Sequence, residues 1–218
     1  MKVVAFVPIK LNSERVPMKN IRAFKNGEPL ICYILNTLLQ VKGVDEIFVY
    51  CSSEEIKKYL PEGVQFLKRS EYYDLSSTPF NEVLAGFAQE VEADVYVLTH
   101  ATAPFIKRES IEQAIDVVVQ ESFDSSLTVS KLQEFVWKDG KPFNYKSDNI
   151  PRTQDLEVMY VETCGLYVYE RKLILEENRR IGDNPFLVEI SKIEASDINE
   201  EEDFLIAEAL YQKSREKY

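Results

Sequence analysis

The sequence VVAFVPI, residues 3–9, is followed directly by KLNSERVPMKN, residues 10–20. The first stretch is an unbroken apolar run rich in β-branched residues, which predicts a strand covered on both faces. The second contains no glycine and carries three cations and two small hydrogen-bonding side chains, namely Lys10, Arg15, Lys19, Asn12 and Ser13. Open α/β sheets bind ligands at the carboxyl ends of their strands, so we expect this loop to bind a polyanion. The alternative is that these cations are scattered surface charges.

Strand and helix patterns alternate through the next hundred residues. Apolar residues recur at helical spacing after Pro29, and EIFVYC at 46–51 reads as a second strand. The other expected elements are strands at 64–69 and 95–101 and helices at 53–60, 79–92 and 108–121. Repeated strand–helix units predict an α/β fold, a Rossmann-like, doubly wound and mostly parallel sheet.

The pattern changes to strands and turns after Ser125. Strands are expected at 125–132 and 158–169, and Asp139-Gly140 between them is a hairpin signal. A closing helix is expected from Asn199 onward. We therefore expect a single domain over residues 1–218, with a small β-rich excursion over residues 125–170.

Composition restricts the class of protein. A chain of 218 residues with 45% hydrophobic and 29% charged residues can build one sizeable core. Its net charge of -11 disfavours nucleic acid as a partner. Three widely spaced cysteines fit neither a disulfide framework nor a zinc site. No convincing signal peptide or membrane span is present, so we expect a cytoplasmic protein with reduced thiols and no membrane partner.

The opening loop is not a glycine-based phosphate site, because neither G-x-x-x-x-G-K-[ST] nor G-x-G-x-x-G occurs in the chain. KLNSERVPMKN instead resembles the first signature of the cytidylyltransferases that activate sialic acids and related 3-deoxy-ulosonic acids as CMP-sugars. Ser13, Pro17 and Lys19 match both the sialate branch and the 3-deoxy-octulosonate branch. Asn20 follows the first branch and Arg15 the second. The resemblance implies a fold of the nucleotide-diphospho-sugar transferase type.

The resemblance also implies roles for the loop. Lys10, Arg15 and Lys19 would neutralise the triphosphate of CTP and serve as the catalytic cations, while Asn12 and Ser13 would bind the nucleotide. Lys10 stands where both branches carry arginine. That difference keeps the charge but removes the bidentate guanidinium.

Two further segments resemble the nucleotide-binding parts of the family. Arg69, at the end of the expected third strand, falls where the family has an arginine near the cytosine ring. The hydroxyl run Ser76, Ser77 and Thr78 enters the next helix, and Ser77 is expected to reach the nucleotide. The alternative for this run is ordinary helix capping.

Four candidate substrate contacts come from two other segments. His100 stands where the sialate enzymes have glutamine, and Thr102 matches the family. His100 is the only histidine, which excludes a multi-histidine metal site. The alternative to a substrate contact is that His100 is a strand-end residue whose hydrogen bonds are made within the protein. Arg152 and Gln154 resemble the proline-arginine-x-glutamine of the sialate branch, and Arg152 would bind the sugar carboxylate. Cys164 replaces a family asparagine, which leaves the exact sugar open.

The segment before the last helix resembles the family's closing signature. Asp197 matches a metal-binding aspartate, and Asn199 stands where the second one is expected. Magnesium prefers hard oxygen ligands and often uses one or two carboxylates with substrate phosphates. The alternative is an acidic helix start that favours the helix dipole.

Together these resemblances imply a Mg²⁺-dependent cytidylyltransferase that transfers CMP from CTP to the anomeric hydroxyl of an acidic, sialic acid-like sugar and releases pyrophosphate. They also imply a homodimer that pairs through the β-rich excursion. Two alternatives remain open. One is another sugar nucleotidyltransferase, including a 3-deoxy-octulosonate cytidylyltransferase, and the other is a non-catalytic relative that binds nucleotide.

Overall fold

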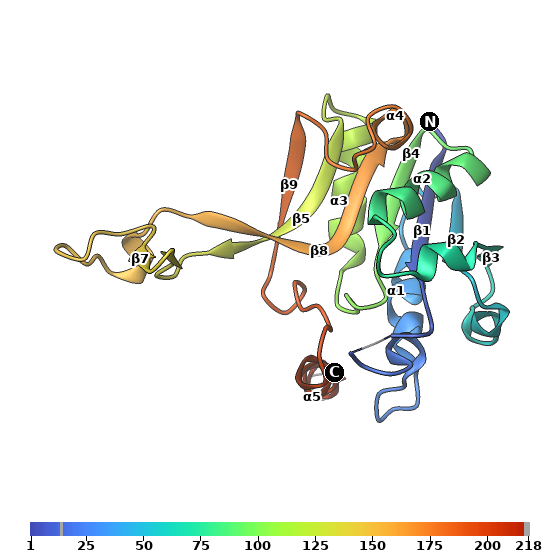
Figure 1. Cartoon of the computed structure of the whole chain (residues 1–218), viewed down its shortest axis with the longest axis horizontal. Coiled ribbons are helices and arrows are strands. Elements are labelled where there is room, and N and C mark those ends of the chain that lie inside the picture. The colour runs from blue at the N-terminus through green and yellow to red at the C-terminus, as the bar shows by residue number, and fades with distance from the viewer. Residues whose placement is uncertain (14, 216–218) are drawn as a thin grey trace.

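A computed structural model describes residues 1–13 and 15–215 of the chain, and its centre is a seven-stranded sheet (Figure 1). The strand order is β3-β2-β1-β4-β8-β5-β9. The strands are β1 (Val3–Ile9), β2 (Glu46–Cys51), β3 (Val64–Lys68), β4 (Val95–Thr99), β5 (Ser125–Leu132), β8 (Met159–Glu170) and β9 (Pro185–Ile190). All neighbours pair in parallel except β8, which is antiparallel to β4 and β5. The predicted mostly parallel sheet is confirmed.

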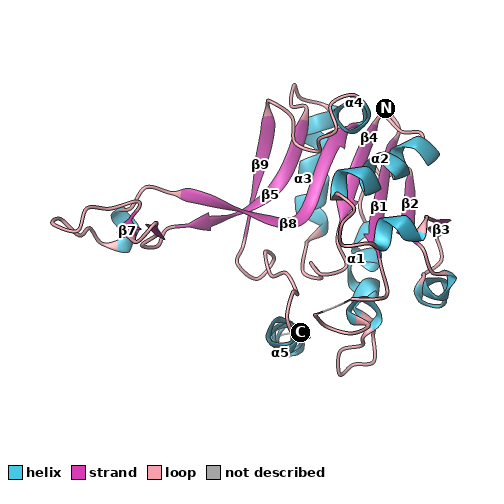
Figure 2. Ribbon diagram, viewed as in Figure 1, coloured by secondary structure: helices cyan, strands magenta, loops and turns pink. Residues whose placement is uncertain are grey.

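Helices cover both faces of the sheet (Figure 2). One face packs against α1 (Leu30–Leu38) and α3 (Arg108–Val119), and the other against α2 (Phe80–Glu90) and α4 (Arg171–Leu175). On the α2 face the ring of Phe6 stacks on that of Phe87, with centroids 4.0 Å apart. None of the helices in the described residues is long and apolar enough to cross a membrane.

The last helix, α5 (Glu201–Arg215), lies beyond the carboxyl ends of the parallel strands (Figure 1). Phe204 of α5 packs in a separate small core with Phe24 and Leu30. The Arg22 guanidinium binds the Glu201 carboxylate through two hydrogen bonds, at 2.6 and 2.8 Å. The C-terminal segment is therefore held against the loop that follows β1.

Some elements differ from the sequence-based expectation. The helix expected at 53–60 is a 3-10 helix, Glu54–Tyr59, and further 3-10 turns occur at Lys19–Ile21, Glu71–Asp74 and Thr153–Asp155. The short helix α4 and the strand β9 were not expected. The three cysteines, Cys32, Cys51 and Cys164, are free thiols as predicted.

A kink in β8 separates the part of the strand in the main sheet from the part that leaves it. Leu127 of β5 pairs with Tyr167, but Val129 pairs with Glu162, so extra residues of β8 are accommodated between these pairs. Within that irregularity Cys164 has a φ of 57°, in the left-handed region. A Cβ on neighbouring Gly165 would lie 3.0 Å from Ala103 and Ile106 side-chain atoms, so this strand passes very close to the loop after β4.

Beyond the kink the chain forms a projecting arm, defined here as residues 131–160 (Figure 1). Near its tip β6 (Trp137–Lys138) and β7 (Lys141–Pro142) form the expected hairpin. Asp139 and Gly140 both have positive φ, 51° and 74°, as a two-residue hairpin turn of this kind requires. The expected excursion over 125–170 thus begins and ends inside the main sheet, and its middle part projects.

Candidate active site

A cavity of about 310 Å³ lies at the carboxyl ends of β1 and β4, where the sequence placed the ligand site. Its volume is at the lower end of the range for small-molecule sites. The residues in its wall that the sequence singled out are Lys10, Ser13, Lys19, Arg69, His100 and Thr102. These side chains come from three strand ends that only the parallel pairing of β1 with β2 and β4, and of β2 with β3, brings together.

Lys19 is the most enclosed cation of the loop after β1. The residue is 8% exposed, and its ammonium donates a hydrogen bond to the backbone carbonyl of Ile198. Burial lowers the pKa of Lys19, the Asp197 carboxylate raises it, and Arg15 lowers it. The amino group of Lys19 therefore lies between the cavity and the segment that precedes α5.

The other two cations share a second cavity with Lys19. This cavity has a volume of about 280 Å³, and Lys10, Ser13, Arg15 and Lys19 are all in its wall. Lys10 donates from Nζ to the carbonyl oxygen of Asp74 at 3.2 Å. All three predicted cations therefore converge on one region, which suits a polyanionic ligand.

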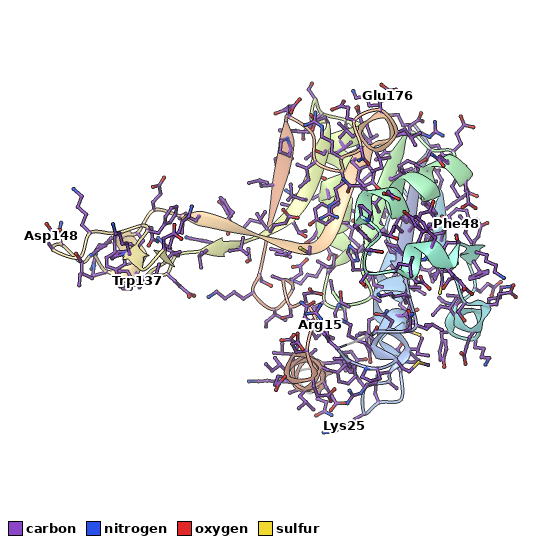
Figure 3. The ribbon with its side chains drawn as sticks, in the orientation of Figure 1. Arg15, Lys25, Phe48, Trp137, Asp148 and Glu176 are labelled. Carbon is purple, nitrogen blue, oxygen red and sulfur yellow. The ribbon has the colours of Figure 1, made fainter. Side chains whose placement is uncertain are left out.

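Arg15 differs from the lysines because it is already paired. Its guanidinium donates to Glu200 at 3.0 Å and to the side-chain oxygen of Asn199 at 3.1 Å. Figure 3 shows Arg15 beside α5, and its side chain is 59% exposed. An exposed ion pair of this kind is weak, so an incoming phosphate can displace Glu200 at low cost.

A buried guanidinium forms another part of the main cavity. Arg69 is 6% exposed and donates from Nη2 to Asp74 at 2.7 Å, while Ser52 donates to the other carboxylate oxygen of Asp74. The buried Nε of Arg69 has no hydrogen-bond partner among the described residues. That nitrogen is closed off from the cavity as well as from solvent, so Arg69 contributes a fixed positive charge to the cavity wall, held in place by Asp74. The sequence reasoning missed Asp74, although a carboxylate five residues after a strand-end arginine was a usable signal.

Two of the predicted nucleotide contacts occupy other positions. Asn12 is exposed and lies in the wall of an adjoining cavity with Ser52 and Asp74. Ser77 is exposed and outside the main cavity wall, to which its neighbours Ser76 and Thr78 contribute. The hydroxyl of Thr78 donates to the backbone carbonyl of residue 72, at 2.7 Å, and closes the turn that orients this run.

His100 lies in the wall of the main cavity next to the start of α2. Its ring centre is 5.6 Å from that of Phe80. The pKa of His100 is lowered to about 4, mainly by burial and also by the nearby Arg180, while Asp197 acts in the opposite direction and raises it. His100 is therefore a neutral imidazole at pH 7, able to donate one hydrogen bond and accept another.

This pKa predicts how stability depends on pH. The folded-state pKa of about 4 lies below the unfolded value of 6.5, so the unfolded chain binds more protons between these pH values. The contribution of His100 to the free energy of unfolding should fall as the pH drops through this window, by at most about 1.4 kcal/mol per pH unit. Denaturant unfolding measures the free energy of unfolding at pH 5 and at pH 7, and the difference between the two values should be smaller for His100→Gln than for the wild type. An equal difference in the two proteins would contradict the lowered pKa of His100.

The residues expected to hold a metal lie just before α5. Asn199 donates from its amide to Asp197 at 2.7 Å, and Arg15 binds its oxygen. Asp203 accepts from the backbone N–H groups of Asn199 and Glu200, at 2.9 and 2.8 Å, so it caps α5. Asn199 therefore does not cap this helix with its side chain. No group of three His, Cys, Asp or Glu that could hold a metal occurs among the described residues.

That donor set fits one kind of metal site. Asp197 provides a single carboxylate that forms no ion pair among the described residues, beside the amide of Asn199. One carboxylate is enough for Mg²⁺ when the substrate phosphates and water supply the remaining oxygens. It is too few for a metal ion held by protein side chains alone.

Within one chain, the structure does not bring Arg152 and Gln154 to the cavity. Both lie on the arm, which Figure 3 shows through the labelled Trp137 and Asp148. Arg152 is 72% exposed on its side chain and binds the Asp155 carboxylate twice, at 2.7 and 2.9 Å. The physical reason is the kink in β8, which directs this segment away from the main sheet.

A doubly wound sheet with converging cations and a buried guanidinium at the carboxyl ends of its strands defines an α/β protein with a site suited to a polyanionic ligand. A family model described as "Cytidylyltransferase" matches residues 4–216. The chain belongs to the cytidylyltransferase family.

Several relatives match over most of this chain. An N-acylneuraminate cytidylyltransferase of Oncorhynchus mykiss is 26% identical over 79% of this chain and 42% of its own length. The chain therefore spans less than half the length of that vertebrate protein. A pseudaminic acid cytidylyltransferase of Campylobacter jejuni and a CMP-N,N'-diacetyllegionaminic acid synthase of Legionella pneumophila are each 25% identical over 99% of both chains.

Solved structures show the same fold. A CMP:2-keto-3-deoxy-manno-octonic acid synthetase complexed with CTP superposes with a TM-score of 0.74 over 98% of this chain and 100% of its own, at 15% identity. A 4-diphosphocytidyl-2C-methyl-D-erythritol synthase of Anaerococcus prevotii gives 0.69 over 97% and 96%, at 14% identity. At these identities the likeness shows the fold alone, which is of the nucleotide-diphospho-sugar transferase type.

Proposed function

We propose that the protein transfers CMP from CTP to the anomeric hydroxyl of an acidic nonulosonate sugar, with Mg²⁺, and releases pyrophosphate. The observation that carries this proposal is the charge pattern of the site. Lys10, Arg15 and Lys19 converge on two adjoining cavities, which suits a triphosphate, and the guanidinium-bearing Arg69 is in the wall of the larger one. Relatives named for sialic, pseudaminic and legionaminic acids support a nine-carbon sugar acid.

The arrangement suits an in-line displacement. The sugar hydroxyl attacks the α-phosphorus of CTP, a new P–O bond forms, the bond to pyrophosphate breaks, and the hydroxyl proton is released to solvent. Lys10 and Lys19 hold and neutralise the triphosphate, while Arg15 exchanges Glu200 for a phosphate oxygen. Catalysis on these residues rests on positioning and on stabilising charge rather than on a covalent intermediate.

Asp197, beside Asn199, is the side chain that would hold Mg²⁺. The bound ion would add positive charge next to the phosphates. Lys19 donates to the backbone carbonyl of Ile198, the residue next to Asp197, so the triphosphate-binding loop contacts the segment that would hold the metal.

A homodimer through the arm is part of this proposal. The arm exposes large apolar side chains, including Trp137 at 61%, Phe143 at 57% and Ile150 at 65%. Exposed apolar groups gathered on a projecting segment are typical of a protein interface. The three free thiols support a cytoplasmic location, where cysteines stay reduced.

A pyrophosphate-release assay with CTP, UTP, ATP and GTP against a panel of sugar acids and sugar 1-phosphates tests the function. We expect release with CTP and a nine-carbon acid, dependent on Mg²⁺, and none with glucose 1-phosphate or mannose 1-phosphate. Preferential use of 3-deoxy-octulosonate or of another nucleotide would replace this proposal with the corresponding alternative. CTP binding without any release would identify a non-catalytic relative.

A further inference from the structure

A cation that the sequence reasoning did not single out lies against Phe80, a residue of the main cavity wall. Arg180 belongs to the loop between α4 and β9, and its guanidinium is 4.0 Å from the centre of the Tyr167 ring and 5.5 Å from that of the Phe80 ring. Phe80 is in the cavity wall and its ring neighbours that of His100. Arg180 also helps to lower the pKa of His100, so its charge acts on this wall of the cavity.

The guanidinium of Arg180 is only partly used by the protein. Its Nη2 donates to the Tyr167 hydroxyl at 3.1 Å and lies 3.5 Å from the carboxylate of Glu162. The Tyr167 hydroxyl donates in turn to Glu162. No bond to the other guanidinium nitrogens is made among the described residues. A guanidinium with one occupied corner keeps donors for a planar carboxylate.

The loop that carries Arg180 is fixed in place before any ligand arrives. At its start Asn81, in the first turn of α2, donates to the carbonyl of Asn178 at 2.6 Å. Toward its end Asp124 accepts hydrogen bonds from two backbone N–H groups of the loop, at 2.8 and 2.9 Å. A side chain of such a loop, packed on the ring of Tyr167, is preorganised for binding.

We propose that Arg180 binds the carboxylate of the acidic sugar within the same chain that binds CTP, and so determines the preference for sugar acids. This inference rests on the proposed function. It replaces the sequence-based assignment of that role to Arg152, which lies on the arm and is already paired with Asp155. Arg180 instead contacts the ring of Phe80, which neighbours His100, and its guanidinium keeps donor nitrogens that are not hydrogen-bonded among the described residues.

The test compares the best nine-carbon acid of the panel with its carboxamide, in the wild type and in Arg180→Ala. Arg180→Ala should lower kcat/KM for the acid roughly ten- to hundredfold, the effect of losing a charge-assisted hydrogen bond. It should leave kcat/KM for the carboxamide and the KM for CTP unchanged. Arg180→Lys should recover part of the loss. Lys172→Ala is the matched control, because Lys172 is exposed and pairs with Glu170, at the end of β4 and β8 that is opposite the cavity.

Three results would overturn the inference. The first is an unchanged preference for the acid in Arg180→Ala. The second is loss of that preference in Arg152→Ala instead, which would assign the carboxylate to the arm. The third is a parallel loss of CTP use and thermal stability in Arg180→Ala, which a purely structural role would produce.

Failure of the proposed function itself is a separate result. It would appear as no transfer from CTP to any acid by the wild type. Equilibrium binding of the acid in the presence of CMP then decides the role of Arg180. Tighter binding by the wild type than by Arg180→Ala supports the inference, and equal binding overturns it.

Discussion

Lys19→Ala should lower kcat/KM for CTP by roughly ten- to hundredfold, the effect of removing a charge-assisted contact of about 1.5–3 kcal/mol. Lys19 is the most enclosed of the three cations and is in the wall of both cavities, so its replacement removes a cation from each of them. Arg15→Ala should fall at the low end of that range, because Arg15 is exposed and already paired with Glu200. Steady-state pyrophosphate release at varied CTP measures both effects.

Lys42→Ala is the matched control for these variants. Lys42 is exposed and precedes β2, at the opposite end of the sheet from the cavity. Its replacement should leave the kinetics for CTP unchanged. CTP kinetics equal to the wild type in both Lys19→Ala and Arg15→Ala would refute the assignment of the triphosphate site.

Asp197→Ala should abolish Mg²⁺-dependent turnover, because Asp197 is the one carboxylate at the proposed metal site without a capping or ion-pair role among the described residues. Asn199→Ala should cost less, since a neutral amide is a weaker partner for a hard dication. Asn199→Asp should reduce the Mg²⁺ concentration that gives half-maximal activity. Titration of activity with Mg²⁺ measures all three.

Asp203→Ala separates metal binding from helix capping. Asp203 accepts two backbone hydrogen bonds at the start of α5, so its loss should lower the free energy of unfolding by about 1 kcal/mol. The Mg²⁺ requirement should stay the same.

Full activity of Asp197→Ala at limiting Mg²⁺ would mean that the acidic segment serves only as the beginning of a helix.

The fold could be predicted well where buried elements correspond to continuous or regularly spaced apolar residues in the sequence. The continuous apolar run of β1 identified a central strand, and the alternating units after it identified the doubly wound sheet. The helix α4 has only five residues, too few for a helical repeat to appear. Strand β9 lies at an edge of the sheet, where one strand neighbour is enough and the apolar pattern is weaker. The antiparallel direction of β8 depends on long-range pairing that a local pattern does not encode.

The site was predictable only in part for the same reason. Lys10 and Lys19 could be found because they lie in one loop at a strand end. Asp74 and Arg180 come from other loops, and each joins the cavity through tertiary contacts. Arg152 resembles a family residue in the sequence, but the structure places it on the arm. That position follows from the kink in β8, which the residue types in this segment do not predict.

Because the kink in β8 separates the arm from the main sheet, the length of the arm can change without changing the sheet. The chain leaves the main sheet along β5 and returns to it along β8, and the two strands are paired with each other. Residues inserted between them therefore do not move the strand ends around the cavity. Closing a longer excursion has a small entropic cost, about 0.6 kcal/mol for each doubling of loop length. A shift of one residue at Gly165 would be far more damaging, because it would drive a side chain into Ala103 and Ile106. Deletions in the arm should therefore be tolerated by the folding of the sheet, whereas the strand register at the kink is fixed.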